Sequence, residues 1–291
     1  MRLAIIGADG QLGCDIMLAL QNENPVALTE KEIDVTNKAQ VKSVFSNIRP
    51  GFVINTAAFT DVDRCETEER MAFSVNALGA KHVAECCDAI GATLLHISTD
   101  YVFNGRKTTP YKENDTTAPI NIYGATKRTG EVNVQTACKK HYIVRTSGLY
   151  GLSPCIGKGG RNFADSMLAL AEERDLLKIV SDEVLTPTFT EDLSEQLRVF
   201  LDQSLPFGIY HATNEGKCSW YEFANTIFEM ANISVQVEKI GSAEWGAPAK
   251  RPAYSVLENA KLLKHLRCTM PHWGNALERF LQKRGALKTQ A

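Results

Sequence analysis

The sequence predicts an α/β protein, with a doubly wound parallel sheet and a smaller, partly interleaved α/β domain beside it. In the first half of the chain, short apolar runs alternate with amphipathic stretches, and a glycine-rich turn follows the first apolar run. Alternation at this rhythm is typical of βαβ units, in which a parallel sheet carries helices on both faces. After about residue 147 the rhythm breaks, which indicates the second domain.

The first half supplies most of the predicted sheet and its helices. Strand patterns stand at Leu3–Ile6, Val26–Leu28, Phe52–Asn55, Thr93–Ile97 and Tyr142–Arg145. Helical patterns lie between them at Gln11–Gln21, Lys38–Ile48, Glu68–Ile90 and Asn121–Ala137. Asn37 and Thr67 stand where helix caps are expected, and Pro25 and Pro50 follow two of the helices.

The second half mixes helices with short strands. Helices are expected near Arg161–Glu173, Glu191–Leu201, Ser219–Ala231, Leu257–Leu266 and Trp273–Lys283. Strands are expected at Lys178–Val180, Gly208–Ala212 and Val235–Ile240, with a proline-bearing turn at Thr186–Thr188. We divide the chain into a nucleotide-binding domain of residues 1–146 plus about 187–213, and a smaller domain of about 147–186 plus 214–291.

Composition excludes several classes of protein. The 291 residues are 44% hydrophobic and 23% charged, with a net charge of −2, and these are ordinary globular values. Because no long basic run occurs, we expect neither nucleic-acid binding nor peripheral membrane binding. No stretch approaches the ~18–20 apolar residues of a spanning helix, and the eight cysteines lack metal-ligand spacing. We expect a cytoplasmic protein with reduced thiols and no structural zinc.

A glycine-rich turn, Gly7-Ala8-Asp9-Gly10-Gln11-Leu12-Gly13, follows the first strand and opens a helix. Glycines permit the tight turn and let the backbone approach a pyrophosphate, which free N–H groups at the helix N-terminus then hold. The turn predicts a Rossmann-type dinucleotide site built from Gly7, Gly10, Gln11, Leu12 and Gly13. A glycine-rich turn that serves packing only is the alternative.

The end of the second strand bears on the choice of dinucleotide. Enzymes that use NAD hold the adenine ribose 2′-OH with an acidic residue at this point. Here the sequence reads Ala27-Leu28-Thr29, with no carboxylate, and Thr29 with the nearby Lys31 leaves room for a 2′-phosphate. We therefore expect NADPH to be used at least as well as NADH.

Tyr123 and Lys127 open a predicted helix four residues apart, so they share one face. A lysine ammonium near a phenol lowers the pKa of the phenol, and such a tyrosine can protonate a carbonyl oxygen as hydride arrives. Ser98 and Thr99 end the fourth strand, at the sheet edge where open α/β sheets bind ligands. Accidental spacing, and hydroxyls that only satisfy the backbone, are the alternatives.

Together these segments resemble the dTDP-4-dehydrorhamnose reductase family, in order and with the right spacing, from residue 1 to about 280. The matching segments are Gly7–Gly13, Asn55–Glu66, Ser98–Gly105, Tyr123–Glu131, Arg145–Ser147, Asn162–Phe163 with Met167–Leu168, Asp182–Thr188, Gly208–Phe223 and Arg251–Leu257. The resemblance implies reduction of dTDP-4-dehydro-6-deoxy-L-mannose to dTDP-L-rhamnose by NADPH, or NADH, with a tyrosine as proton donor.

The resemblance also implies roles for individual residues. Thr99, Tyr123 and Lys127 match the catalytic set of the family. Tyr123, Lys127 and the glycine turn are expected to contact the cofactor. Further cofactor contacts are expected from Asp34, Val35, Ala57, Ala58, Thr60 and Ser98. Substrate contacts fall on Tyr101, Asn162, Trp220 and Arg251. The forked arginine suits a diphosphate, whereas Trp220, an aromatic in a predicted helix, is also a candidate for the core.

The sequence departs from the family pattern near residue 148. Gly148 stands where a tryptophan often follows Arg-Thr-Ser, and the loop Leu152–Gly160 looks longer than in compact members. We expect the segment Leu149–Gly160 to cover a sugar pocket that Gly148 leaves open, against the alternative that Gly148 is a plain turn residue. Asp15 matches one position at which some relatives bind Mg²⁺ through glutamates at a dimer interface. Without a full set of ligands no metal is predicted, and a homodimer is left open.

Other activities stay open at this point. One is another extended-family reductase, or an epimerase or dehydratase, acting on a related nucleotide sugar; for a dehydratase, Asp100 is the candidate acid. Another is a non-catalytic regulatory subunit resembling the β subunit of methionine adenosyltransferase. The intact Thr99, Tyr123 and Lys127 weigh against a non-catalytic role.

Overall fold

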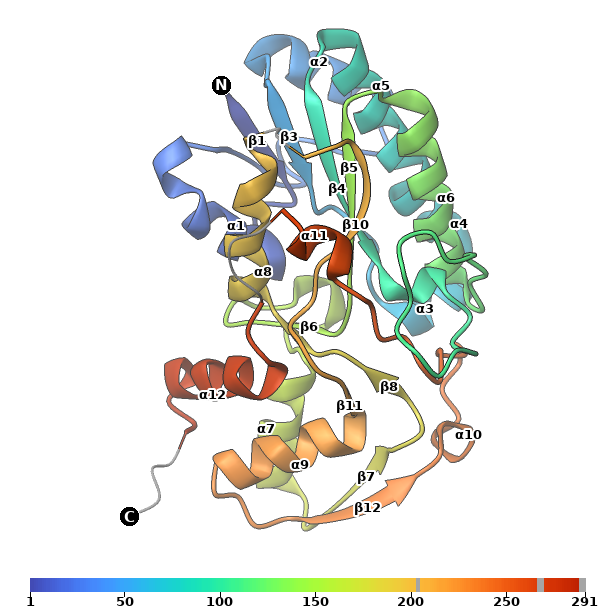
Figure 1. Ribbon diagram of the computed structural model, residues 1–291, viewed down its shortest axis with the longest axis vertical. Helices are drawn as coiled ribbons and strands as arrows, with labels where there is room; N and C mark the ends of the chain where they lie inside the picture. Colours follow the sequence, from blue (N-terminus) through green and yellow to red (C-terminus); the bar gives the residue numbers. More distant parts are fainter. Residues whose placement is uncertain (203–204, 266–269, 288–291) are drawn as a thin grey trace.

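The computed structural model describes residues 1–202, 205–265 and 270–287 (Figure 1). A parallel sheet with helices on both faces forms one end of the molecule, and a second group of helices and short strands forms the other. The predicted fold class, a Rossmann-type α/β protein, is confirmed.

The central sheet has six parallel strands in the order β10-β5-β4-β3-β1-β2. They are β1 (Leu3–Ile6), β2 (Val26–Leu28), β3 (Phe52–Asn55), β4 (Thr93–Thr99), β5 (His141–Thr146) and β10 (Gly208–His211). The chain order reverses between β1 and β3, whose ends pair at Ile6 and Asn55. Open α/β sheets bind ligands at this kind of reversal, beyond the carboxyl ends of the strands.

Two hydrophobic layers hold the helices against the sheet. Leu3 and Ile5 face α1 (Gln11–Ala19) and α8 (Thr190–Leu197). Ala4 and Ile6 belong to the opposite layer, because successive strand residues point to opposite faces. That layer is covered by α2 (Lys38–Ile48), α5 (Ala80–Ile90) and α6 (Ile122–Ala137).

The expected long helix at Glu68–Ile90 forms in three successive segments. These are α4 (Glu69–Phe73), the π-helical η2 (Ser74–Gly79) and α5. The predicted cap at Asn37 is confirmed, because its side chain accepts from the Gln40 N–H at 3.1 Å. The predicted cap at Thr67 is wrong. Thr67 is the last residue of α3 (Val62–Thr67), and its hydroxyl donates to the Arg64 carbonyl.

The second group of elements packs around aromatic rings, among them Tyr150, Phe189, Phe223 and Phe280. Its helices are α7 (Phe163–Glu173), α9 (Trp220–Met230), α10 (Ser242–Trp245) and α12 (Trp273–Arg284). Its strand pairs are β6 (Leu149–Tyr150) with β9 (Thr188–Phe189), β7 (Leu176–Val180) with β12 (Gln236–Ile240), and β8 (Val184–Leu185) with β11 (Cys218–Ser219).

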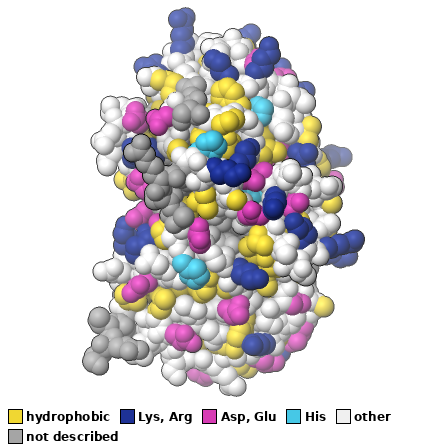
Figure 2. All heavy atoms as spheres, viewed as in Figure 1, with side chains coloured by type: hydrophobic (Ala, Val, Ile, Leu, Met, Phe, Trp, Pro, Cys, Tyr) yellow, Lys and Arg dark blue, Asp and Glu magenta, His cyan; other side chains and the backbone are white. Residues whose placement is uncertain are grey.

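The remaining helical segments are short. They are α11 (Ala260–Leu263) and the 3-10 turns η1 (Gln21–Glu23), η3 (Asp100–Val102), η4 (Ile156–Lys158) and η5 (Arg198–Phe200). The helix expected over Leu257–Leu266 is reduced to α11, while Leu266 itself and Cys268 lie outside the described residues. Among the described residues, no helix combines the length and apolarity needed to cross a membrane. On the face drawn in Figure 2, basic and acidic side chains are interspersed.

Candidate active site

The glycine turn between β1 and α1 is tight because of its backbone conformation and its packing. Gly7 has φ +77°, in the left-handed region that glycine adopts without strain. A Cβ at Gly13 would lie 2.0 Å from the Gly7 carbonyl oxygen, so only glycine fits there. Gly10 is the N-cap of α1 and has no side chain to cap the first N–H groups of the helix. The first N–H groups of α1 are therefore arranged as a phosphate site requires.

The end of β3 packs against this turn. The Thr56 hydroxyl donates to the Ile6 carbonyl at 2.8 Å, and the Ala57 N–H donates to Asn55 Oδ1 at 3.1 Å. Ala57 lies directly beside Gly7, where an added Cβ would be 3.0 Å from the Ala57 nitrogen. The structure thus brings Ala57 to the turn, and cofactor contacts of Ala57 and Ala58 stay predictions.

The end of β2 carries a carboxylate that sequence reasoning missed. Glu32 Oε2 accepts from both the Thr29 N–H at 2.8 Å and the Thr29 hydroxyl at 2.5 Å. These bonds lower the pKa of the exposed Glu32 carboxyl. The expectation of no carboxylate beside Thr29 is therefore wrong. The expectation fails because a turn after β2 folds Glu32 back onto Thr29. The sequence at the strand end alone does not reveal this contact.

Asp34 and Val35 follow this turn, and Val35 belongs to the hydrophobic layer under α2, α5 and α6. Asp34 Oδ1 accepts from the Thr36 N–H at 2.8 Å, which orders a short turn. Val35 is buried against Gly79 of η2. Their proposed contact with adenine stays a prediction.

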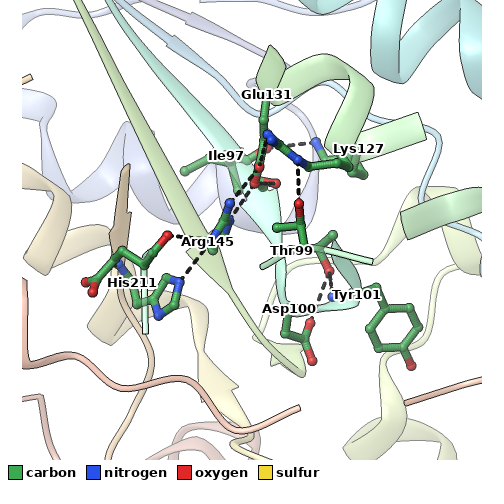
Figure 3. Close-up of polar contacts among 12 residues, drawn as sticks. Ile97, Thr99, Asp100, Tyr101, Lys127, Glu131, Arg145 and His211 are labelled. Atoms are coloured by element: carbon green, nitrogen blue, oxygen red, sulfur yellow. Dashed lines mark hydrogen bonds and ion pairs between the residues drawn. The ribbon is translucent and has the colours of Figure 1, made fainter. Parts of the chain in front are cut away.

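Thr99 and Lys127, two of the three predicted catalytic residues, lie near the carboxyl end of β4 (Figure 3), and the third, Tyr123, stands at the start of α6. Thr99 is the last residue of β4, and its hydroxyl hydrogen-bonds the Tyr123 phenol. Asn121 caps α6 by accepting from the Gly124 N–H at 2.7 Å, which fixes the helix start that carries Tyr123. One turn further, Lys127 is buried and its Nζ donates to the Ile97 carbonyl at 2.7 Å. The Thr–Tyr–Lys arrangement is thus assembled by one strand end and one helix.

Electrostatics at the two titratable groups differ from the sequence expectation. Burial raises the pKa of Tyr123 above its ordinary value, with only the Thr99 hydrogen bond opposing it. Burial also lowers the pKa of Lys127 to about 8, although Glu131 partly restores it. The expected lowering of the tyrosine pKa is therefore not found, because burial dominates. A neutral phenol is the form that can donate a proton.

A buried ion cluster supports the catalytic end of β4. The Glu131 carboxylate accepts from Arg145 Nε at 2.7 Å and Nη2 at 2.8 Å, from the Ser98 hydroxyl at 2.7 Å and from Arg128 Nη1 at 3.1 Å. Arg145 also reaches His211 Nε2 at 3.5 Å, and burial together with the Arg145 charge lowers the pKa of His211 to about 3. The cluster ties α6 to β4 and β5. Ser98 therefore serves this network, and its contact with a cofactor stays a prediction.

Asp100 is a second buried carboxyl beside the catalytic threonine. It accepts from the hydroxyls of Thr99 at 3.0 Å and Ser147 at 2.9 Å, and it hydrogen-bonds Ser255. Burial raises its pKa, and these hydroxyls oppose the rise. Asp100 thus orients the Thr99 hydroxyl while it is itself held by three neighbours.

Two of the four predicted substrate residues line one small cavity next to Tyr123. Tyr101 and Trp220 share this cavity with Glu183, and the Tyr101 ring meets the Tyr123 ring edge-on at 5.8 Å. Trp220 also packs on Phe163 with ring centres 4.5 Å apart. One side of its ring thus belongs to the aromatic core, while the residue also lines the cavity.

Arg251 lies beside this cavity. Its Nη2 pairs with Asp63 Oδ2 at 2.9 Å, and its charge acts on Tyr101 and Glu183. It is thus a cation close to two of the residues that line this small cavity, Tyr101 and Glu183.

Asn162, the fourth predicted substrate residue, is held in a structural role. Its side chain caps α7 by accepting from the Asp165 N–H at 3.0 Å, and it donates to the Gly151 carbonyl at 2.9 Å and to Asp165 Oδ2 at 2.7 Å. No contact in the described residues brings it to the cavity of Tyr101 and Trp220.

Gly148 is a turn residue, and the wall beside it is filled. Its φ is +55°, and a Cβ there would lie 2.7 Å from Leu185 Cδ1. Leu185 also lines the cavity of Tyr101 and Trp220, so it occupies the place where an open wall was expected. That expectation was wrong because β8, distant in sequence, supplies the side chain.

The following loop lies against the predicted cofactor residues. Gln11 Nε2 donates to the Ser153 carbonyl at 3.1 Å, and Gly157 lies next to the Thr60 hydroxyl. Cys155 is close enough to Tyr123 to act on its charge. The loop thus contacts the glycine-turn side of the site and comes close to Tyr123, and its role as a cover over the sugar pocket stays a prediction.

Asp15 lies inside the fold. Its carboxylate accepts from the Thr190 hydroxyl at 2.5 Å, and burial raises its pKa. Within the described ranges, no three His, Cys, Asp or Glu side chains are grouped as a metal site. Asp15 is therefore explained by packing between α1 and α8.

The sheet order, the glycine turn and the Thr–Tyr–Lys arrangement define a Rossmann-type enzyme of the extended short-chain dehydrogenase/reductase class. More narrowly, the chain belongs to the RmlD substrate binding domain family, whose model matches residues 1–285. The resemblance to the dTDP-4-dehydrorhamnose reductases is thereby confirmed.

Individual relatives cover nearly the whole chain. It is 40% identical over 288 residues to the spore coat polysaccharide biosynthesis protein SpsK of Bacillus subtilis (strain 168), with 98% of each chain covered. It is 37% identical over 292 residues to the dTDP-4-dehydrorhamnose reductase of Aggregatibacter actinomycetemcomitans, covering 95% of this chain and 97% of that one. A crystal structure of the dTDP-4-dehydrorhamnose reductase of Bacillus anthracis str. Ames, in complex with NADP, superposes with a TM-score of 0.92 at 41% identity, covering 97% and 99% of the chains.

Proposed function

We propose that this chain is an NADPH-dependent reductase that converts dTDP-4-dehydro-6-deoxy-L-mannose (dTDP-4-dehydrorhamnose) to dTDP-L-rhamnose. The observation that carries the proposal is the meeting of Thr99, Tyr123 and Lys127 at the end of β4, between the glycine turn and the small cavity that Tyr101 and Trp220 line. Relatives named dTDP-4-dehydrorhamnose reductase, and one such structure with NADP, support the substrate and the cofactor.

The residues present fit a dinucleotide. No space for a Cβ remains at Gly13, because α1 packs directly against the turn. The N–H groups at the N-terminus of α1 are therefore left for a pyrophosphate. Gly7, Gly10, Gln11, Leu12, Ala57, Ala58 and Thr60 would surround it, and Lys127 would reach its nicotinamide ribose. When bound, the reduced nicotinamide supplies the hydride for C4 of the sugar.

The protein's own groups handle the proton. Tyr123, kept neutral by burial, donates its phenolic proton to the C4 oxygen as negative charge develops there. The Thr99 hydroxyl donates to Asp100 at 3.0 Å and, when substrate binds, would turn this proton to the C4 oxygen and so position the carbonyl. The Lys127 ammonium, held by the Ile97 carbonyl, stabilises the phenolate that remains.

Binding of the rest of the substrate falls to the second domain. We assign the cofactor to residues 1–146 plus about 187–213 and the nucleotide-sugar to about 147–186 plus 214–291. In support, β10 joins the central sheet, while Trp220 of the other part lines the cavity and Arg251 acts on Tyr101 and Glu183. Arg251 would take the diphosphate by exchanging part of its pairing with Asp63. A contact from Asn162, a cytoplasmic location and a homodimer remain predictions.

A turnover assay tests the proposed function. Purified protein is mixed with NADPH and dTDP-4-dehydrorhamnose, and the loss of reduced-nicotinamide absorbance is followed while the product is identified by chromatography and NMR. We expect stoichiometric formation of NADP⁺ and dTDP-L-rhamnose. An epimerase or dehydratase would convert its nucleotide sugar without net loss of NADPH, and a regulatory subunit would show no turnover. Either outcome would overturn the assignment.

A further inference from the structure

The cavity next to Tyr123 is lined by a carboxylate, Glu183, that has no role in the reduction proposed above. Glu183 lies in the turn between β7 and β8, is 6% exposed and lines the cavity with Tyr101, Leu185, Trp220 and Ser255. We propose that Glu183 is a specificity-determining residue that accepts hydrogen bonds from the C2 and C3 hydroxyls of the hexose. This proposal rests on the function proposed above.

Chemistry at Glu183 favours a ligand that brings hydrogen-bond donors. A buried carboxylate is costly unless its oxygens are hydrogen-bonded, and an ionised carboxylate has about four acceptor positions. The Trp220 indole N–H supplies one donor, and Arg251 supplies nearby positive charge. Burial nevertheless raises the pKa of Glu183, so these partners do not compensate fully for desolvation. Two neighbouring sugar hydroxyls would supply further donors in the geometry a carboxylate accepts.

The position of Glu183 selects one edge of the sugar ring. The cavity adjoins the catalytic groups through two contacts, because Tyr101 touches Tyr123 and Ser255 hydrogen-bonds Asp100. The C4 oxygen therefore sits at the Tyr123 end, and the anomeric diphosphate at C1 points toward Arg251, which is close to Glu183.

Two edges join C4 to C1 in a hexose ring. One carries the C2 and C3 hydroxyls, and the other carries the C5 methyl group of a 6-deoxy sugar. The Glu183 carboxylate accepts hydrogen bonds from the hydroxyl edge, whereas the methyl edge offers it no donor. Glu183 thus favours one of the two ring orientations that place C4 at Tyr123, the one that turns the hydroxyl edge toward the carboxylate.

Binding of the reaction product separates this role from a structural one. Isothermal titration calorimetry compares dTDP-L-rhamnose with dTDP alone on wild type, on Glu183→Gln and on a control, Asp182→Asn. Asp182 is the adjacent carboxylate, but it is exposed and accepts from the Ser242 N–H at 2.8 Å and hydroxyl at 3.0 Å. We expect Glu183→Gln to weaken dTDP-L-rhamnose binding about 10- to 100-fold, as for hydrogen bonds to a charged group, with dTDP binding unchanged. The control should change neither.

A second measurement compares ligands that lack one hydroxyl. Wild type should bind the 2-deoxy and 3-deoxy analogues of dTDP-L-rhamnose more weakly than the parent, and Glu183→Gln should lose this discrimination. Equal weakening of dTDP and dTDP-L-rhamnose in Glu183→Gln would mean that Glu183 only supports Trp220 and Arg251, and would overturn the proposal. Unchanged discrimination between the parent and its analogues would also overturn it. If wild type binds dTDP but shows no gain from the sugar, the proposed function itself fails, a result distinct from either of these.

Discussion

Replacing Gly13 by alanine tests the dinucleotide turn most sharply. The added Cβ would lie 2.0 Å from the Gly7 carbonyl oxygen and 2.9 Å from Ala8 Cα. Ordinary contact needs about 3.5 Å, so α1 must move about 1.5 Å away from the turn. Both neighbours are backbone atoms of the turn, which cannot rotate away as a side chain could.

The displacement should damage binding more than folding. Misplacement of about 1 Å at a binding site can cost about 10²-fold, so we expect the Kd of NADPH to rise at least that much. Overpacking costs about 1–3 kcal/mol, which predicts a fall in Tm of about 2–10 °C. Fluorescence titration of NADPH and thermal unfolding followed by circular dichroism measure the two effects.

A matched control separates the clash from the chemistry of the substitution. Gly274 lies in the first turn of α12, where an added Cβ would be 3.4 Å from His272 Nδ1, an ordinary contact. Gly274→Ala should leave NADPH binding unchanged and stabilise the helix by up to about 1 kcal/mol. If Gly13→Ala binds NADPH as tightly as wild type, the glycine turn does not hold the dinucleotide and the reasoning is refuted.

Further expected results concern the acid, the cofactor, pH and the loop. Tyr123→Phe should lower kcat about 10²–10⁴-fold with little change in the Kd of NADPH, and near-normal turnover would remove Tyr123 from the mechanism. Glu32→Gln removes a negative charge beside Thr29 and should raise the kcat/KM ratio of NADPH to NADH about tenfold, whereas an unchanged ratio would place the 2′-phosphate elsewhere. Because burial lowers the pKa of Lys127 to about 8, kcat/KM should fall as pH rises through this value and the ammonium loses its proton; a flat profile to higher pH would contradict that role. Deleting Cys155–Lys158 should weaken NADPH binding more than sugar binding, since the loop contacts Gln11 and Thr60. The opposite result would support a loop that covers the sugar instead.

Local sequence signals predicted the sheet and its helices because they depend on neighbours along the chain. The continuous apolar run Leu3–Ile6, buried between the two hydrophobic layers, and the cap at Asn37 are examples of such local control. Thr67 shows the limit of this reasoning. A threonine before a helical pattern reads as a cap, but here it closes the preceding short helix through its bond to the Arg64 carbonyl.

The candidate site was predicted only where one segment carries the chemistry. Tyr123 and Lys127 share a helix turn, and Thr99 ends the adjacent strand, so spacing and sheet position sufficed. The Glu131–Arg145 pair and the filling of the wall by Leu185 both arise from segments distant in sequence. Glu183 lay within a recognised segment, Asp182–Thr188, yet only the fold shows that it faces the cavity while Asp182 faces outward.

Hydride transfer to C4 of the sugar is the central claim, and isotope transfer tests it most directly. The enzyme is supplied with NADPH deuterated at the transferring carbon and with dTDP-4-dehydrorhamnose, and the product is examined by NMR. We predict one deuterium at C4 of dTDP-L-rhamnose for each NADP⁺ formed, and loss of this transfer in Tyr123→Phe. Product without deuterium at C4, or with the label still in the cofactor, would contradict the account.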